Sequence, residues 1–189
     1  MACDQGNKDA CFASGKTAEM AGLTDVAKTY YEKSCKLGYN LGCHNLGDIF
    51  HKKGLTDQAR AQFKIGCSLK YGGSCNNLGV YANERGIKSD SMKFFKQGCE
   101  LNSDKACYNY GGVLLADKAD VQAQAPLEKA CHIGYIPACN DLGVAQEHLK
   151  KNAEAKNNYL KACQGQYGMG CSNYADYLQD EKKFSEAKN

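Results

Sequence analysis

Small and large side chains recur along the chain at a spacing that one face of an α-helix produces. A small residue is followed four positions later by a large one, and three positions after that by another small one. Residues three and four apart share one face of a helix, whereas a strand repeats every second residue. The first small residue is Ala27, Ala59, Ser91, Ala123, Ala155 or Ala187, and the large one is Tyr31, Phe63, Phe95, Leu127 or Tyr159. The pattern predicts an amphipathic helix that returns every 32 residues.

A second helix is predicted in every repeat, beginning about one residue before the second cysteine of each pair, which lies eight residues after the first. This second helix, which we name helix A, carries an Asn-Leu-Gly block and is expected at Ala138–Leu149 in one copy. The helix with the small and large columns, helix B, is expected at Asp57–Cys67. Pro126 is expected to delay or kink a helix B, and Pro137 to lie in the first turn of a helix A.

The fold class is therefore predicted to be all-α, with residues 1–189 forming one repeat domain of about six helical hairpins. The first and last hairpins are incomplete. Cys3 is already in phase with the repeat, and residues 184–189 begin a helix that other copies continue for six more residues. We therefore expect the chain to be a fragment of a longer protein. A single hairpin cannot bury its apolar face, so stability is expected to come from stacking of neighbouring hairpins.

The repeated block from Lys33 to Gly47, with its Leu-Gly-Tyr and Cys-x-Asn-Leu-Gly segments, resembles the Sel1-like repeat. This family is related to the tetratricopeptide repeat, and the similarity is to its cysteine-rich bacterial branch. The resemblance covers the whole chain and implies a right-handed α/α solenoid with helix A on the concave side. It implies an adaptor or assembly factor, and also admits a penicillin-binding or β-lactam-hydrolysing enzyme. Sel1-like repeats are usually longer than this one, so the loop between the helices is trimmed here.

All twelve cysteines belong to pairs with the spacing Cys-x7-Cys. This spacing places one thiol at the end of helix B and the other at the start of the next helix A, within reach of a disulfide. The alternatives are reduced core cysteines and metal or redox chemistry, although zinc sites favour closer Cys spacing. The predicted disulfides are Cys3–Cys11, Cys35–Cys43, Cys67–Cys75, Cys99–Cys107, Cys131–Cys139 and Cys163–Cys171. Disulfides indicate an oxidising compartment, namely the bacterial periplasm, the cell exterior or the mitochondrial intermembrane space, and the bacterial-looking repeat favours the first two.

Composition and charge argue against several classes of partner. The formal net charge is only +3, and lysines occur singly or in pairs, so no basic face for nucleic acid is expected. No apolar run approaches the roughly 18 residues that span a bilayer, so no membrane insertion is expected. The sequence predicts neither a cofactor nor a metal site.

Catalytic chemistry should appear as residues that interrupt the repeat, and few do. The four histidines are His44, His51, His132 and His148. His44 and His51 share one face of a helix A but lack a metal-binding motif, and they are interpreted as solvated groove residues. The only Ser-x-x-Lys sequence runs from Ser185 to Lys188, without the companion motifs of a β-lactam-recognising enzyme. We predict that the chain is not an enzyme.

A column of amides on helix A is the better functional candidate. An Asn side chain can both donate to and accept from a peptide backbone, although it can equally tie helix A to the preceding loop. Neighbouring columns vary between copies, as a variable binding surface would. The predicted binding groove comprises Asn45, Asn77, Asn109, Asp141, Asn173, His51, Asp48 and Asn83. The predicted function is a non-enzymatic scaffold that binds a protein or peptide, and the alternatives are the enzyme above or an immunity or secretion-assembly protein.

Overall fold

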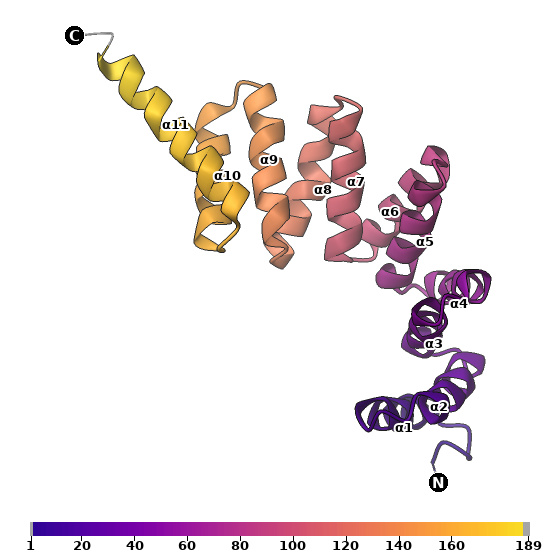
Figure 1. The fold of residues 1–189 in the computed structure, drawn as a ribbon. Helices are drawn as coiled ribbons and strands as arrows, with labels where there is room; N and C mark the ends of the chain where they lie inside the picture. The colour runs from indigo at the N-terminus through magenta and orange to yellow at the C-terminus, as the bar shows by residue number, and fades with distance from the viewer. Residues whose placement is uncertain (1, 187–189) are drawn as a thin grey trace. The chain divides into compact units, whose positions relative to one another are not determined.

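The structure is a computed structural model that describes residues 2–186, with side chains described as far as Gln179. All secondary structure in this range is helical (Figure 1). Helices A and B alternate along the chain, in the order α1 (Lys8–Met20), α2 (Thr24–Lys36), α3 (Asn40–Lys52), α4 (Thr56–Ser68), α5 (Gly72–Glu84), α6 (Lys88–Glu100), α7 (Asp104–Ala116), α8 (Asp120–Ile133), α9 (Ile136–His148), α10 (Asn152–Gln164) and α11 (Gly168–Glu186). The odd-numbered helices are helices A, and the all-α hairpin fold predicted from the sequence is confirmed.

The period of the repeat follows from the lengths of its parts. Helices such as α3 and α4 contain 13 residues each. Three residues connect α3 to α4, and three more connect α4 to α5. Two helices and two connections therefore fill one 32-residue repeat. The helices begin one or two residues earlier than the sequence pattern predicts, because the first turn carries few of the periodic residues.

Each connection contains one residue with a left-handed backbone. Between helix A and helix B this residue is Gly54 (φ +74°) in the second repeat and Lys150 (φ +62°) in the fifth. The following amide then bonds back across the helix end, as when Leu55 N–H donates to the Phe50 carbonyl over 2.9 Å. These bonds satisfy carbonyls that the helix end would leave without partners. The tight caps allow three residues to reverse the chain direction.

Within each hairpin, the large residue of helix B packs against the glycine of the Asn-Leu-Gly block. Phe63 is 1% exposed, and a Cβ added to Gly47 would lie 2.6 Å from its ring. The same relation joins Gly143 to Tyr159 and Gly111 to Leu127. Burying one such side chain stabilises the fold by about 1.5–3 kcal/mol. Any side chain larger than hydrogen would push the two helices apart, which explains why the sequence keeps glycine there.

Each repeat carries a disulfide, six in all. In the described residues no cysteine is free. Cys35 and Cys43 have Cα atoms 4.6 Å apart, and Cys131 and Cys139 have Cα atoms 4.8 Å apart. The predicted pairing is confirmed for Cys3–Cys11, Cys35–Cys43, Cys67–Cys75, Cys131–Cys139 and Cys163–Cys171, and the rival interpretations of these cysteines as reduced residues or metal ligands are wrong.

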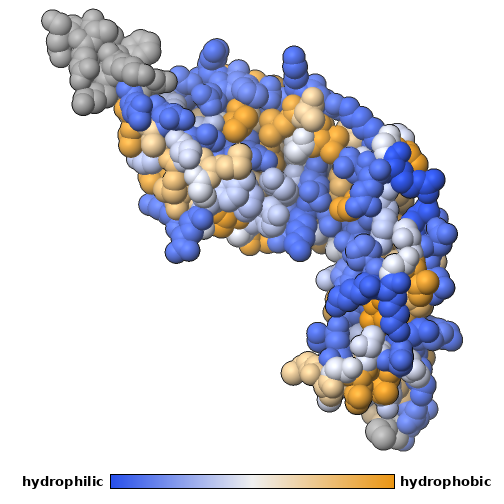
Figure 2. Space-filling model, in the orientation of Figure 1, coloured by the Kyte–Doolittle hydropathy of each residue, from blue (hydrophilic) through white to orange (hydrophobic). Residues whose placement is uncertain are grey.

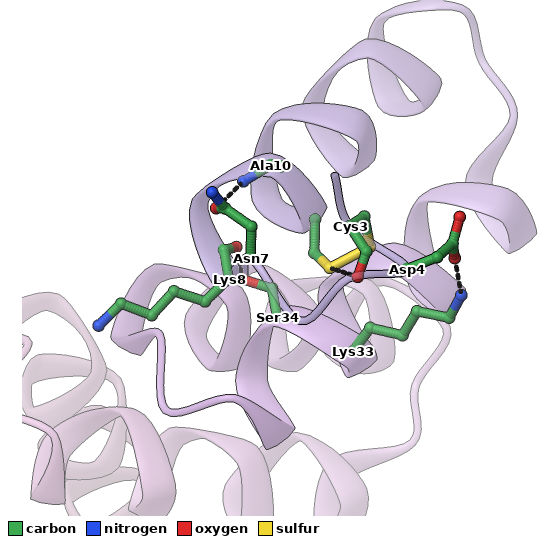
Figure 3. Close-up of a disulfide and its surroundings, with 8 residues drawn as sticks. Cys3, Asp4, Asn7, Lys8, Ala10, Lys33 and Ser34 are labelled. Atoms are coloured by element: carbon green, nitrogen blue, oxygen red, sulfur yellow. Dashed lines mark hydrogen bonds and ion pairs between the residues drawn. A yellow bond between two sulfur atoms is a disulfide. The ribbon is translucent and has the colours of Figure 1, made fainter. Parts of the chain in front are cut away.

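The first disulfide, between Cys3 and Cys11, shows how the loop around it is held (Figure 3). Asn7 caps α1 by accepting a hydrogen bond from the backbone N–H of Ala10 over 2.9 Å. The hydroxyl of Ser34 donates to the carbonyl of Lys8 over 2.9 Å. A buried serine of α2 therefore ties the end of one helix to the start of α1.

The two prolines behave differently from one another. Pro137 lies in the first turn of α9, as predicted, where its missing N–H costs no helical hydrogen bond. Pro126 lies inside α8, yet this helix begins at its usual position and runs unbroken from Asp120 to Ile133. The expected delay of the helix is therefore wrong. Pro126 and Leu127 are both buried, and this burial offsets the single lost backbone bond.

The chain divides into two compact units, Met1–Asn102 and Ser103–Asn189. In the first unit a hydrophobic core includes Tyr31, Leu46, Phe63 and Leu78. In the second unit the core side chains include Leu127, Leu142 and Tyr159. Figure 2 shows hydrophilic side chains over much of the visible surface, with hydrophobic residues in separate patches. No helix in the described part of the chain is both long and apolar enough to cross a bilayer.

Candidate functional site

The polar side chains of neighbouring helices A contact one another in the first unit. The Nδ2 atom of Asn77 on α5 lies 3.5 Å from Oδ1 of Asp48 on α3, which is a long hydrogen bond. The Nε2 atom of His44 lies 3.4 Å from the other oxygen of Asp48. Burial lowers the pKa of His44 and raises the pKa of Asp48. The half-buried site therefore favours the neutral forms of both groups.

His51 joins α3 to α5 at a second point. Its Nδ1 atom lies 2.6 Å from the hydroxyl of Tyr81, and the two rings meet edge to face. A cavity of about 150 Å³ lies beside this pair, and Asn77 and Glu84 also line it. We call this cavity the α3–α5 cavity. Its other lining residues, Phe63 and Val80, are apolar.

Asn45 lies on α3 and faces the preceding repeat. Its side chain hydrogen-bonds the hydroxyl of Tyr31, which also donates to Oε2 of Glu19 over 2.6 Å. Burial, followed by the hydrogen bond to Glu19, raises the pKa of Tyr31. Tyr31 in turn lowers the pKa of Glu19. Asn45 thus hydrogen-bonds a buried hydroxyl and also forms part of the polar face of helix A.

In the second unit the polar face is built from amides. The Nδ2 atom of Asn173 on α11 donates to Oδ1 of Asn140 on α9 over 2.9 Å. Asn140 donates in turn to Asp141 over 3.2 Å, and Tyr108 on α7 also hydrogen-bonds that carboxylate. Burial raises the pKa of Asp141, and it also raises the pKa of Tyr108 to about 12. Three successive helices A are therefore linked by one chain of side-chain contacts.

The eight predicted groove residues fall into two sets. Asn45, Asp48, His51 and Asn77 lie on α3 and α5 of the first unit, and Asn83 is exposed near the end of α5. The remaining three, Asn109, Asp141 and Asn173, lie half-buried on the helices A of the second unit. The asparagines with described partners contact neighbouring helices rather than the preceding loop.

The loop tyrosines pack across the boundary between hairpins. The ring of Tyr39 lies 5.1 Å from that of Phe12, and Tyr71 lies 4.7 Å from the ring of His44. Tyr135 contacts Tyr108 in the same way, with ring centroids 4.9 Å apart. Each tyrosine precedes one helix A and covers the first turns of the helix A before it.

A pair that sequence analysis missed joins the groove column to the core. Glu147 accepts a hydrogen bond from the hydroxyl of Tyr159 over 2.7 Å, as Glu19 does from Tyr31. Where the buried ring is Phe63 instead, the equivalent position of helix A is His51. The signal was present in the sequence, because glutamate occurs at this position together with tyrosine twelve residues later.

Comparison with known structures identifies the architecture. Over 98% of its length the chain matches the crystal structure of c5321, a protective antigen of uropathogenic Escherichia coli with an SLR fold, at 20% identity and a TM-score of 0.79. The chain spans 44% of that protein. A Sel1 repeat protein from Oxalobacter formigenes matches 90% of the chain and is itself covered to 76%, at 16% identity and a TM-score of 0.69. This is a Sel1-like repeat fold.

Two further comparisons place this Sel1-like fold beside the tetratricopeptide repeats. The family model described as tetratricopeptide repeat matches residues 136–164, which cover α9 and α10. YrrB, described as a TPR protein with an unusual peptide-binding site, matches 94% of the chain and is covered to 93%, at 15% identity and a TM-score of 0.56. No curated protein matches the sequence. Proteins with these repeats are typically non-enzymatic, protein-binding scaffolds.

One arrangement in this Sel1-like chain has the composition of a hydrolytic triad. The hydroxyl of Ser74 lies 3.1 Å from Nδ1 of His44, whose other nitrogen faces Asp48. Ser74 is 0% exposed and packs against Gly66, so no substrate can reach its hydroxyl. The arrangement therefore stabilises the contact between α3 and α5.

The Ser-x-x-Lys sequence lies at the end of the described residues. Ser185 lies in the last turns of α11, where side chains are not described, and Lys188 lies outside the described residues. Among the residues that are described, no group of three His, Cys, Asp or Glu side chains could hold a metal ion.

Proposed function

We propose that this chain is a non-enzymatic scaffold that binds a peptide or an extended protein segment along its helices A. The α3–α5 cavity is the observation that carries the proposal. It lies between two successive helices A and is lined by both polar and apolar side chains. The volume of about 150 Å³ is below the usual range for small-molecule pockets, roughly 300–1,000 Å³. It suits one side chain of a peptide.

The groups around the cavity are already held in position. His51 is hydrogen-bonded to Tyr81, and Asn77 contacts Asp48. Side chains that are ordered before binding lose less entropy when a ligand arrives. Glu84 supplies a carboxylate at the same cavity, while Phe63 and Val80 supply an apolar surface. The cavity thus offers a positively charged or amphipathic side chain both an ionic and an apolar partner.

The comparisons support a peptide as the ligand. YrrB, which matches the chain over 94% of its length, carries a peptide-binding site by its description. The two units are proposed to bind through their own helices A, and the α3–α5 cavity lies in the first unit. An immunity or secretion-assembly role would use the same surface with one dedicated partner.

The proposal places the protein in the bacterial periplasm or outside the cell. Six disulfides support this placement, because thiols in the cytosol are kept reduced. Purification under nitrogen from periplasmic and cytoplasmic fractions, with immediate alkylation, should find the cysteines oxidised in the periplasm only. Full oxidation in the cytoplasmic fraction would contradict this placement.

The binding site can be tested by panning a displayed library of random dodecapeptides against the oxidised chain. Glu84→Gln and Asn77→Ala should each weaken the binding of a selected peptide by roughly tenfold, the effect of losing one charged or well-placed hydrogen bond. Gln58→Ala, on the exposed face of α4, is the matched control and should bind normally. Variants that melt at a lower temperature yet bind with unchanged affinity would show that these residues are structural, and would contradict the proposed binding site.

A further inference from the structure

A second cavity in the first unit is lined by both arginines of the chain. Arg60 on α4 and Arg85 at the end of α5 both line a cavity of about 150 Å³. Lys64 lies one turn after Arg60 and lines the same cavity. Leu78, Phe94 and Ile87 form its apolar wall. We call it the arginine cavity, and of its lining residues only Tyr81 also lines the α3–α5 cavity.

The charges around the arginine cavity are not balanced internally. Its lining carries three cationic side chains and one carboxylate, Asp90, so its net charge is +2. Arg60 contacts Asp57 at 3.4 Å, but Asp57 is 97% exposed, and such surface pairs contribute little. Among the described residues, none forms an ion pair with Lys64 or Arg85. A bound anion would therefore gain cationic partners that the fold itself leaves open.

This concentration of charge breaks the repeat. One repeat earlier, the positions of Arg60, Lys64 and Arg85 are taken by Lys28, Glu32 and Lys53. There Lys53 pairs with Asp25 at 2.8 Å. Lys28 lies over the ring of Phe50, 5.4 Å from its centroid.

Two repeats later, in the second unit, the equivalent positions are uncharged or acidic, being Gln124, Glu128 and Leu149. A feature required by the architecture alone would recur in the other copies. The cationic set therefore belongs to one position along the chain and points to a ligand.

We propose that the arginine cavity binds a glutamate or aspartate side chain of a partner peptide, with an adjacent apolar residue of that peptide against Ile87 and Phe94. A guanidinium group matches a carboxylate with two parallel hydrogen bonds, which a lysine cannot do. The small volume excludes a large cofactor but accommodates one carboxylate side chain. Ile87 is 39% exposed, so an apolar neighbour would gain a partner at the mouth of the cavity. This site shares only Tyr81 with the α3–α5 cavity.

The two arginines allow a direct measurement. Their Nε–Hε groups give two resonances in a ¹⁵N-labelled sample of the whole oxidised chain, and the probe is the dipeptide N-acetyl-Glu-Leu-amide. Both resonances should shift and saturate as the probe is added. The neutral analogue N-acetyl-Gln-Leu-amide should bind at least roughly tenfold more weakly, because the charge-assisted bonds are lost.

Variants separate this site from general electrostatic attraction. Arg60→Gln and Arg85→Gln should each weaken the probe by roughly tenfold, whereas Lys28→Gln and Lys53→Gln, the matched positions one repeat earlier, should leave it unchanged. Equal losses in both pairs of variants, or equal binding of the neutral analogue, would overturn the proposal. Inorganic phosphate that saturates both resonances at lower concentration than the dipeptide would also overturn it, since it would assign the cavity to phosphate.

Discussion

Hairpins α1–α2 and α3–α4 have the same backbone fold but differ in the side chain that forms their buried ring. In α1–α2 the ring is Tyr31, and its hydroxyl reaches Glu19 on helix A. In α3–α4 the ring is Phe63, and the residue at the glutamate position is His51, which turns to Tyr81 of the next repeat instead. Both rings are almost fully buried, at 0% and 1% exposure. The two hairpins differ only in whether the buried ring carries a hydroxyl that reaches the polar face of helix A.

This difference distinguishes helix-A positions that are hydrogen-bonded to the buried ring of their own hairpin from positions that are not. A glutamate that accepts a hydrogen bond from a buried tyrosine is committed to the fold, because a buried hydroxyl without a partner costs about 1–3 kcal/mol. Where the ring is phenylalanine, the residue at the equivalent position of helix A forms no hydrogen bond with the buried ring of its own hairpin. The α3–α5 cavity occurs beside such a position. Features common to all hairpins therefore provide stability, whereas the proposed binding site lies beside a pair that varies between hairpins.

The largest effect should come from a feature that the two hairpins share, the disulfide. Replacing Cys35 and Cys43 together with Ser should cost about 2.6 kcal/mol of unfolding free energy, from the chain entropy of a nine-residue loop. The same double replacement at Cys67 and Cys75 should cost as much, because the loop lengths are equal. Urea unfolding of both variants measures this, and a severalfold difference between them would show that the hairpins are not equivalent.

A smaller loss should follow when the shared glycine is replaced. A Cβ at Gly111 would meet the side chain of Leu127, whereas a Cβ at the adjacent Gly112 would meet nothing within 4 Å. Gly111→Ala should therefore destabilise the protein by about 1–3 kcal/mol through overpacking. Gly112→Ala should stabilise it by about 0.5–1 kcal/mol, because alanine favours the helix.

Thermal melting separates these two variants. Equal effects at the two adjacent glycines would show that close packing does not explain the repeated glycine.

The hydrogen bond between Glu147 and Tyr159, which only some hairpins have, should contribute less to the free energy of unfolding than the glycine. Glu147→Gln and Tyr159→Phe remove the two partners of one hydrogen bond, and a double-mutant cycle should give a coupling energy of about 1 kcal/mol. Tyr159→Phe combined with Glu154→Gln, an exposed carboxylate on the same hairpin, should be additive. A coupling energy near zero for Glu147 and Tyr159 would show that the buried tyrosine does not hold the glutamate in place, and would contradict the distinction between the two kinds of helix-A position.

The smallest effect concerns His44, which only the second repeat carries at its position. Burial lowers the pKa of His44 below its ordinary 6.5, so the unfolded chain takes up this proton more readily than the folded one. Stability should therefore fall as the pH drops below 6.5, by less than about 1 kcal/mol down to pH 5.5. His44→Asn should reduce this fall, and the exposed His132→Asn should leave it unchanged. Urea midpoints at pH 7.5 and 5.5 measure it, and an identical fall in His44→Asn would contradict the assignment.

The sequence by itself determined the features that repeat. The 32-residue period, the two helices of each hairpin, the disulfide pairing and the glycine column follow from spacings within one or two helices. Such local features need no knowledge of how hairpins stack, because a helix places residues three and four apart on one face. The continuity of α8 through Pro126 did not follow, since it depends on burial that the local rule for proline ignores.

Only the tertiary structure decided the partners of the polar side chains. His51 meets Tyr81, thirty residues away, because neighbouring helices A pack at one particular rotation. Arg60 and Arg85 line one cavity for the same reason, although they belong to different helices. The period of a single helix fixes which face a residue occupies but not which residue of the next helix lies opposite. The repeat could therefore be read from the chain, while both cavities and the pairs beside them arise only when the hairpins stack.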